Sequence, residues 1–181
     1  MLFADVVTTS SSVAATSSRT AKIEALTELV RRLGVDEIAP TVGFLTGTPR
    51  QGRIGVGWAS VTAVEIAPAV TPSLTIADLD AAIVALEETR GEGSAAARQA
   101  LLADLLGRAT LDEGAFIRRL LTGELRQGAL DGLMADAAAR AADVKPTRFR
   151  RAPGACERVR HVGRGTREHR QYRAQRFETN G

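Results

Sequence analysis

The chain has 181 residues, of which 44% are hydrophobic and 4% aromatic. This length and composition suit one domain with a tail, built from helices that pack through small and aliphatic side chains. A single cysteine excludes an internal disulfide and a cysteine metal cluster, and two histidines leave little material for a histidine-based site. No apolar run is long enough to span a bilayer, and the first residues lack the basic start of a signal peptide. We therefore expect a cytoplasmic protein without membrane contact.

The net charge of +3 hides a division along the chain. Residues 1–143 hold 13 Lys and Arg against 18 Asp and Glu, a net charge of −5, whereas residues 144–181 hold 11 against 3, a net charge of +8. The tail also lacks a sustained apolar stripe, so we predict that it is mostly disordered on its own. The basic average of the whole chain is therefore no argument that the body binds nucleic acid.

Apolar residues recur with helical periodicity along the first part of the body. Leu26, Leu29, Val30 and Leu33 form one such stripe, and Gly34 should end that helix. Pro40 is tolerated only near a first turn, which favours a short helix around it. The helices expected here are residues 2–16, 18–34 and 36–47.

The segment that follows has a weaker pattern. Residues 57–67 suit a short helix or an extended segment, and residues 67–73 form a linker. We expect Trp58 to be a core anchor rather than a platform on which a base stacks. Gly55 and Gly57 resemble half of a phosphate-binding glycine loop, but neither the preceding strand nor the Gly-Lys-Ser/Thr of such a loop is present.

The second part of the body has clearer helix boundaries. Thr75 should be an N-cap, with Asp78 three residues on as an imperfect capping box. Apolar residues then recur at helical spacing through the expected helices, which are residues 75–91, 94–109, 111–123 and 129–143.

One string, Leu-Thr-Gly-x-x-Arg-Gln-Gly, occurs twice, at Leu45–Gly52 and at Leu121–Gly128. Each copy follows an amphipathic helix and precedes another helical segment. This internal repeat predicts an all-α, pseudo-two-fold symmetric domain of many helices, followed by the mostly disordered basic tail. Gly47 and Gly123 can take the left-handed conformation at the end of a helix.

The rest of the repeated string suits a phosphate backbone. A compact glycine-bounded turn exposes backbone N–H groups beside a helix N-terminus, where an anion binds well. Arg50 and Arg126 can bridge phosphate oxygens, and Gln51 and Gln127 can contact sugars or base edges. Arg53 adds a second charge in the first copy only. Two copies related by a two-fold axis would fit the two strands of a duplex, although duplicated helical hairpins also arise for packing reasons alone.

The segments "LLTGELRQGALDGLMADAAARAA", "RQGRIGVGW" and "LLADLLGRAT" resemble the N-terminal DNA-binding domain of bacterial ATP-dependent DNA ligases. The resemblance covers residues 1–143. It implies an all-helical domain that grips nicked double-stranded DNA, in the nucleoid, for DNA repair, replication or recombination. The residues onto which it carries DNA contact are Arg50, Gln51, Gly52, Arg53, Gly55, Gly123, Arg126, Gln127 and Gly128.

The chain departs from that family at the catalytic lysine, which in a ligase lies in a Lys-x-Asp-Gly motif and accepts AMP. Lys22 is followed by Ile-Glu-Ala and Lys145 by Pro-Thr-Arg, so neither lysine fits. We therefore expect no catalytic residue and no metal site in this chain, no nick sealing by the chain alone, and ATP and Mg²⁺ only for the full-length family enzyme. The Arg-rich residues 144–181 suggest the hypothesis of a truncated or frameshifted end.

Two other functions stay open from the sequence. The chain could be a stand-alone architectural DNA-binding protein whose basic tail is a genuine electrostatic arm. It could also be a helical protein-interaction module, which the net negative body would suit.

Overall fold

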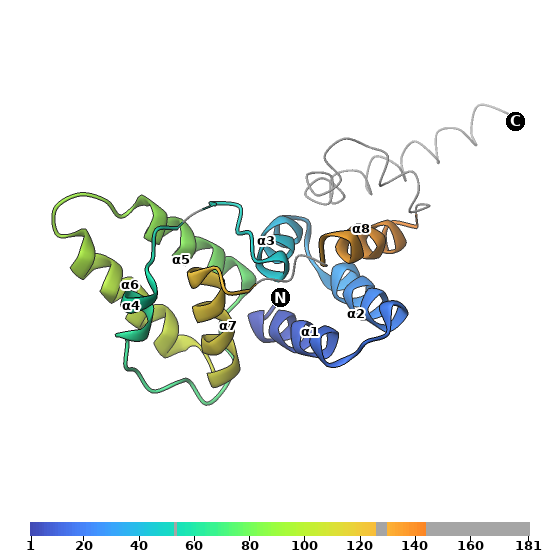
Figure 1. Cartoon of the computed structure of the whole chain (residues 1–181), viewed down its shortest axis with the longest axis horizontal. Helices are drawn as coiled ribbons and strands as arrows, with labels where there is room; N and C mark the ends of the chain where they lie inside the picture. Colours follow the sequence, from blue (N-terminus) through green and yellow to red (C-terminus); the bar gives the residue numbers. More distant parts are fainter. Residues whose placement is uncertain (53, 126–129, 144–181) are drawn as a thin grey trace, which may run out of the picture.

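The structure is a computed structural model that describes residues 1–52, 54–125 and 130–143. These residues form eight helices and no strand, which confirms the predicted all-α fold (Figure 1). The predicted disordered tail lies outside the described residues. The helices are α1 (Phe3–Ala15), α2 (Arg19–Arg32), α3 (Val35–Thr46), α4 (Trp58–Thr62), α5 (Ile76–Glu88), α6 (Ser94–Arg108), α7 (Leu111–Thr122) and α8 (Leu130–Ala141).

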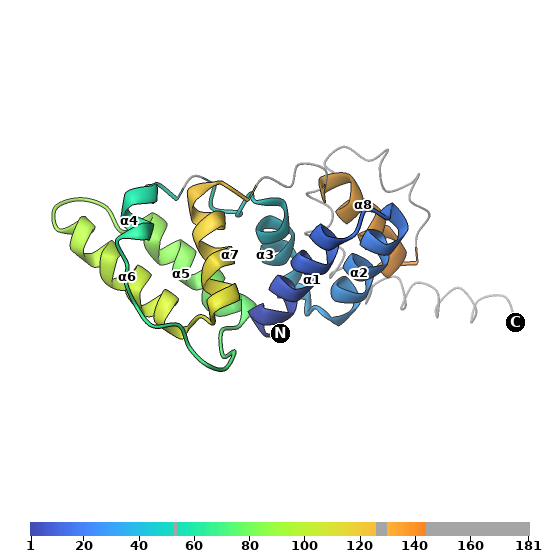
Figure 2. The same ribbon diagram turned by 60° about the horizontal axis from the view of Figure 1, so that its bottom comes forward.

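The helices form two groups that do not follow the order of the chain. The first group contains α1, α2, α3 and α8, and the second contains α4, α5, α6 and α7 (Figures 1 and 2). Helix α8 packs on α2 and α3, and α4 packs on α7. After each Leu-Thr-Gly turn the chain therefore crosses to the other group.

The two groups meet through a shared apolar core. The Phe3 ring of α1 makes edge-on contacts with Phe44 of α3 and Phe116 of α7, with ring centroids 6.0 and 5.4 Å apart. All three rings are buried. Edge-on aromatic pairs of this kind stabilise the packing beyond their buried area. Phe3 therefore ties the second group to the first at the centre of the body.

Matching contacts recur in the two groups. Residues before α1 and α5 pair with each other, since Phe3 N–H donates to the Leu74 carbonyl (2.8 Å) and Ile76 N–H to the Met1 carbonyl (3.2 Å). In each group an aspartate in the first turn of one helix forms an ion pair with an arginine at the end of the following helix. Asp5 of α1 pairs with Arg32 of α2 at 3.0 Å, and Asp78 of α5 pairs with Arg108 of α6 at 2.9 Å. These matched pairs support the predicted two-fold relation, which stays a prediction.

The predicted N-cap at Thr75 is confirmed, and it forms a complete capping box. The Thr75 hydroxyl accepts from the Asp78 N–H, and the Asp78 carboxylate accepts from the Thr75 N–H. Hydrogen bonds from the Thr75 hydroxyl, from Arg108 and from the Thr75 N–H lower the pKa of Asp78 to about 2. Thr110 and Glu113 form the same capping box at the start of α7.

Three local predictions are wrong in detail. Pro40 lies in the second turn of α3 rather than the first, and Gly34 starts α3 as its N-cap instead of ending α2 directly. Trp58 is not a core anchor, because its side chain is 62% exposed. The five-residue helix α4 instead buries Val61, which occupies its inward-facing position.

The Leu-Thr-Gly part of each repeat ends a helix in the same way. Gly47 has φ 73° and ψ 16°, and Gly123 has φ 74° and ψ 14°, so the predicted left-handed conformation is confirmed at both. The preceding threonine hydroxyl donates to the carbonyl four residues back, Thr46 at 2.8 Å and Thr122 at 2.9 Å. This part of the motif is therefore explained by helix termination.

Gly47 and Gly123 offer a matched test of how the two turns meet. A Cβ on Gly47 would overlap the backbone carbonyl of Leu125, whereas a Cβ on Gly123 meets no described atom within 4 Å. Gly123→Ala should cost about 1–2 kcal/mol of folding free energy through its positive φ alone. Gly47→Ala should cost at least about 2 kcal/mol more, because a backbone segment must move. Urea unfolding of both variants checks this, and equal losses would show that the turns do not press together.

Candidate nucleic-acid interface

The first Arg-Gln-Gly segment lies in a long connection between α3 and α4. Thr48 N–H donates to the Gly43 carbonyl at 2.9 Å, which folds the chain back over the end of α3. Gly52 N–H then donates to the Pro49 carbonyl at 2.9 Å, and Gly52 has a positive φ of 75°. Because α4 begins only at Trp58, the expected compact turn beside a helix N-terminus is absent from this copy.

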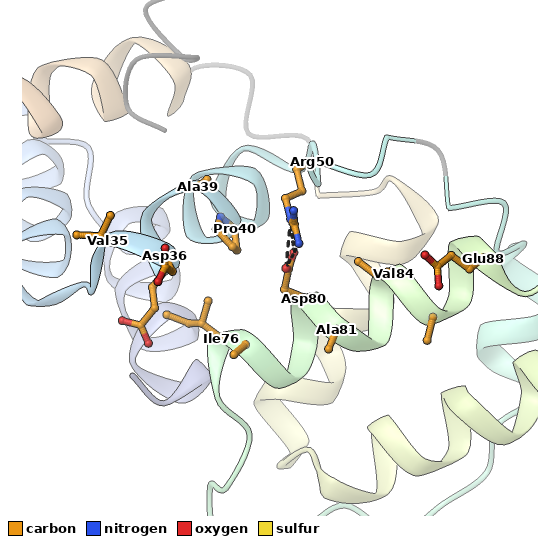
Figure 3. Close-up of a pocket in the computed structure, with 13 residues that line it drawn as sticks. Val35, Asp36, Ala39, Pro40, Arg50, Ile76, Asp80, Ala81, Val84 and Glu88 are labelled. Atoms are coloured by element: carbon orange, nitrogen blue, oxygen red, sulfur yellow. Dashed lines mark hydrogen bonds and ion pairs between the residues drawn. The ribbon is translucent and has the colours of Figure 1, made fainter. Parts of the chain in front are cut away.

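Asp80 of α5 holds both polar side chains of this segment. Arg50 Nε donates to its two carboxylate oxygens at 2.8 and 3.2 Å, and Arg50 Nη2 also bonds to Oδ2 (Figure 3). Gln51 Nε2 donates to Asp80 Oδ1 at 2.9 Å. The Asp80 side chain is 13% exposed and that of Arg50 is 48% exposed. The carboxylate is thus a nearly buried anchor for a half-exposed guanidinium.

Arg50 and Asp80 each stabilise the charged form of the other. Burial raises the pKa of Asp80, but hydrogen bonds from Arg50 and Gln51 and the charge of Arg50 outweigh it, so the pKa lies below its usual value. The hydrogen bonds to Asp80 raise the pKa of Arg50. Asp80 engages only the Nε and Nη2 edge, and Nη1 has no described partner. Arg50 therefore keeps one edge for an outside anion.

A groove of about 740 Å³ lies between α3 and α5, below this cluster. Figure 3 shows Arg50 reaching from the loop after α3 toward Asp80 of α5, and both residues belong to the lining of the groove. Its other polar side chains are acidic, namely Asp36, Glu37 and Glu88, and the rest of its lining is mostly small and apolar. Carboxylates in this number disfavour a phosphate, so an anion would meet Arg50 from the loop side.

The two repeated turns lie against each other, with Gly47 at the Leu125 carbonyl. Figure 2 shows the C-terminal ends of α3 and α7 and the starts of α4 and α8 along the upper edge of the molecule. The structure thus brings the two turns to one edge. Four of the predicted site residues, Arg53, Arg126, Gln127 and Gly128, lie outside the described residues.

Gly55 is another described member of the predicted site. It has a positive φ of 68°, and the guanidinium of Arg98 from α6 lies beside it. Arg98 donates to the carbonyl of the neighbouring Ile54. This part of the loop is therefore held from the second group of helices.

Sequence reasoning missed two residues that organise this region. Asp80 orients Arg50 and Gln51, and Arg118 donates to the carbonyls of Val61 and Val64 at the end of α4, the latter at 3.0 Å. Arg118 thereby supports the C-terminal end of α4. No local pattern marks either residue, because their partners lie 29 or more residues away in the chain.

Charge along the chain favours an anion near the first turn. Residues 38–64 contain Arg50 and Arg53 and no Asp or Glu, although the body as a whole is net negative. Among the described residues, no group of three His, Cys, Asp or Glu side chains could hold a metal ion. None of the described helices is long and apolar enough to cross a membrane.

Asp80→Asn should lower stability by about 1 kcal/mol at neutral pH, because the ion pair with Arg50 is lost. The lowered pKa means that this contribution is complete above the usual aspartate pKa and is lost as pH falls through the folded value. Urea unfolding of both proteins at pH 7 and near pH 2 measures it. Asp104→Asn is the matched control, because its carboxylate is 74% exposed and meets Arg108 only at 4.0 Å. A deficit of the same size at both pH values would contradict the ion pair.

Comparison with known proteins shows which proteins the chain resembles. Residues 59–139 match the family described as DNA ligase N terminus. The chain is 54% identical to a probable DNA ligase of Saccharopolyspora erythraea, 49% to one of Rhodococcus jostii and 51% to one of Nocardia farcinica, each over 152 residues and 84% of this chain. It spans only 29–30% of the length of these relatives. The chain is therefore similar to the N-terminal part of DNA ligases, and residues 59–139 carry the match to their N-terminal domain.

Proposed function

We propose that this chain is the DNA-binding portion of a DNA ligase and that it grips nicked duplex DNA in repair, replication or recombination. The observation that carries the proposal is the contact of the two repeated turns, with Gly47 against the Leu125 carbonyl. The two turns that lead into the Arg-Gln-Gly segments therefore lie side by side. The two backbones of a duplex offer two similar partners for such a pair of loops.

The chemistry of the first loop suits a phosphate. Asp80 fixes the Arg50 guanidinium by one edge and leaves Nη1 for a phosphate oxygen. Gly52 and Gly55 carry no side chain that would block the backbone, and no described atom lies within 4 Å of a Cβ placed on Gly52. Contacts of this kind are independent of base sequence, as an enzyme that acts on breaks anywhere in the genome requires.

The proposal limits what this chain does. Neither lysine lies in a Lys-x-Asp-Gly motif, so we assign nick sealing, with its ATP and Mg²⁺, to the part of a full ligase that this chain does not span. The chain then contributes the grip on double-stranded DNA, in the cytoplasm on the nucleoid. Its DNA contacts are proposed at the two Arg-Gln-Gly segments, together with Arg53, Gly55 and Gly123.

Replacing Arg50 and Arg126 by Ala together should weaken binding to a nicked duplex by about tenfold or more. The slope of log affinity against log salt should fall by about 2, since two phosphate contacts are lost. Fluorescence anisotropy of a labelled nicked duplex at several salt concentrations measures both. Arg90→Ala with Arg140→Ala removes the same charge from the connection after α5 and from the last turn of α8, and it should change little. Equal effects of the two double variants would refute a specific role for the turns.

A chain that ends at Asp143 separates the alternatives, since it keeps all eight described helices. The proposal requires that this shorter chain still binds duplex DNA and still loses affinity on the Arg50 and Arg126 changes. Loss of most of the affinity and salt slope on truncation would instead indicate an architectural protein with a basic arm. No binding at low salt would favour a protein-interaction module.

Gly128→Val should weaken binding without removing a charge.

A further inference from the structure

Trp58 is a large aromatic side chain in a place where packing does not require it. It is 62% exposed at the start of α4, while Val61 of the same helix is fully buried and anchors it. Tryptophan on a surface leaves a large apolar area in water. Single exposed apolar residues are common, so the surroundings of Trp58 decide whether its exposure means anything.

The backbone of α4, which carries Trp58, is held by contacts with α7. Arg118 of α7 donates to the carbonyls of Val61 and Val64, which fixes the C-terminal end of α4. Ile54 and Val56 are buried in the loop before the helix. The tryptophan therefore projects from a supported segment.

The residues next to Trp58 in the chain are small and uncharged. Gly57, Ala59 and Ser60 are all exposed, and none has a side chain large enough to cover an indole. No Asp or Glu occurs between Glu37 and Glu65, whereas Arg50 and Arg53 do. A polyanion can thus approach this segment without meeting a carboxylate of its own stretch of chain.

Helix α4 also lies on the edge that the proposed DNA contacts share. In Figure 2 it stands along the same upper edge as the loop after α3 and the C-terminal end of α7. The arginines of the loop suit phosphates, but they offer nothing to the apolar faces of sugars and bases. An aromatic ring supplies that contact without reading the sequence, because every base has a π-face.

We propose that Trp58 is a nucleic-acid contact residue, which packs its indole against deoxyribose or base faces of a duplex held by the first Arg-Gln-Gly loop. This inference rests on the proposed function and adds an apolar contact to it. Such a contact strengthens binding without adding a phosphate contact. It therefore differs from that of Arg50 in its salt dependence.

The chain itself provides the probe, because Trp58 is its only tryptophan. Selective excitation of tryptophan in the unmodified full chain, during titration with unlabelled nicked duplex, should show emission changing in step with occupancy. The duplex should also protect the indole from quenching by acrylamide. Anisotropy with labelled duplex, measured in parallel, gives the occupancy independently. Full occupancy with unchanged emission and unchanged acrylamide quenching would overturn the proposal.

Variants supply the second measurement. Trp58→Ala should weaken binding by about tenfold and leave the salt slope unchanged, because no charge is removed. Trp58→Phe should recover most of the affinity. Leu111→Ala removes another exposed apolar side chain, 73% exposed, from the opposite end of α7, and it should have no effect. A Trp58→Ala protein with full affinity would overturn the inference while the proposed function stands, whereas no anisotropy change with the unmodified chain would overturn both.

Discussion

The close approach of Gly47 to the Leu125 carbonyl governs how the two groups of helices fit together. Only a residue without a Cβ, in the left-handed conformation, allows one turn to pass directly against the other. At these turns the chain crosses over, so that α8 completes the group that contains α2 and α4 completes the group that contains α7. Each group therefore buries its core with a helix from the other half of the sequence. The body should unfold as one cooperative unit for this reason.

The same arrangement fixes how Arg50 is presented at the surface of a net negative body. Arg50 sits beside a nearly buried carboxylate, which compensates part of its charge and fixes its orientation. Holding a long side chain in one rotamer reduces the entropy that it loses when a ligand binds. The cost is a weaker long-range attraction for phosphate. Asp80 thus weakens the long-range attraction of Arg50 for anions but fixes the orientation of its guanidinium. This suits the proposed contact with a nucleic-acid backbone, which acts at short range.

Much of the fold follows from local patterns, and those parts could be predicted. The Thr75 cap, the apolar stripes and the left-handed glycines each depend on residues within about one turn of each other. The crossing of α4 and α8 between the groups could not be predicted, since the repeat fixes the turns but not where the next helix packs. Asp80 lies 30 residues from Arg50, and nothing near it in sequence marks the pair. The prediction for Trp58 was wrong for a different reason. A tryptophan usually indicates a core position, but the five-residue helix α4 is too short to bury a residue besides Val61.

The repeated string divides into two parts with different physical reasons. Its Leu-Thr-Gly part is fully accounted for by packing, since Leu45 and Leu121 are buried, the threonines bond to the helix backbone and the glycines end the helices. Packing does not account for its Arg-Gln-Gly part in the copy that the structure describes, Arg50 to Gly52. Arg50 is half exposed with one edge unused, and Gln51 Oε1 is buried without a described partner. Packing alone would not select a half-exposed arginine and an unsatisfied amide oxygen at these positions, since each adds little to stability or lowers it. The phosphate backbone that we propose as ligand would supply the missing reason, because it can accept from the free guanidinium edge and suits the acid-free stretch around Arg50.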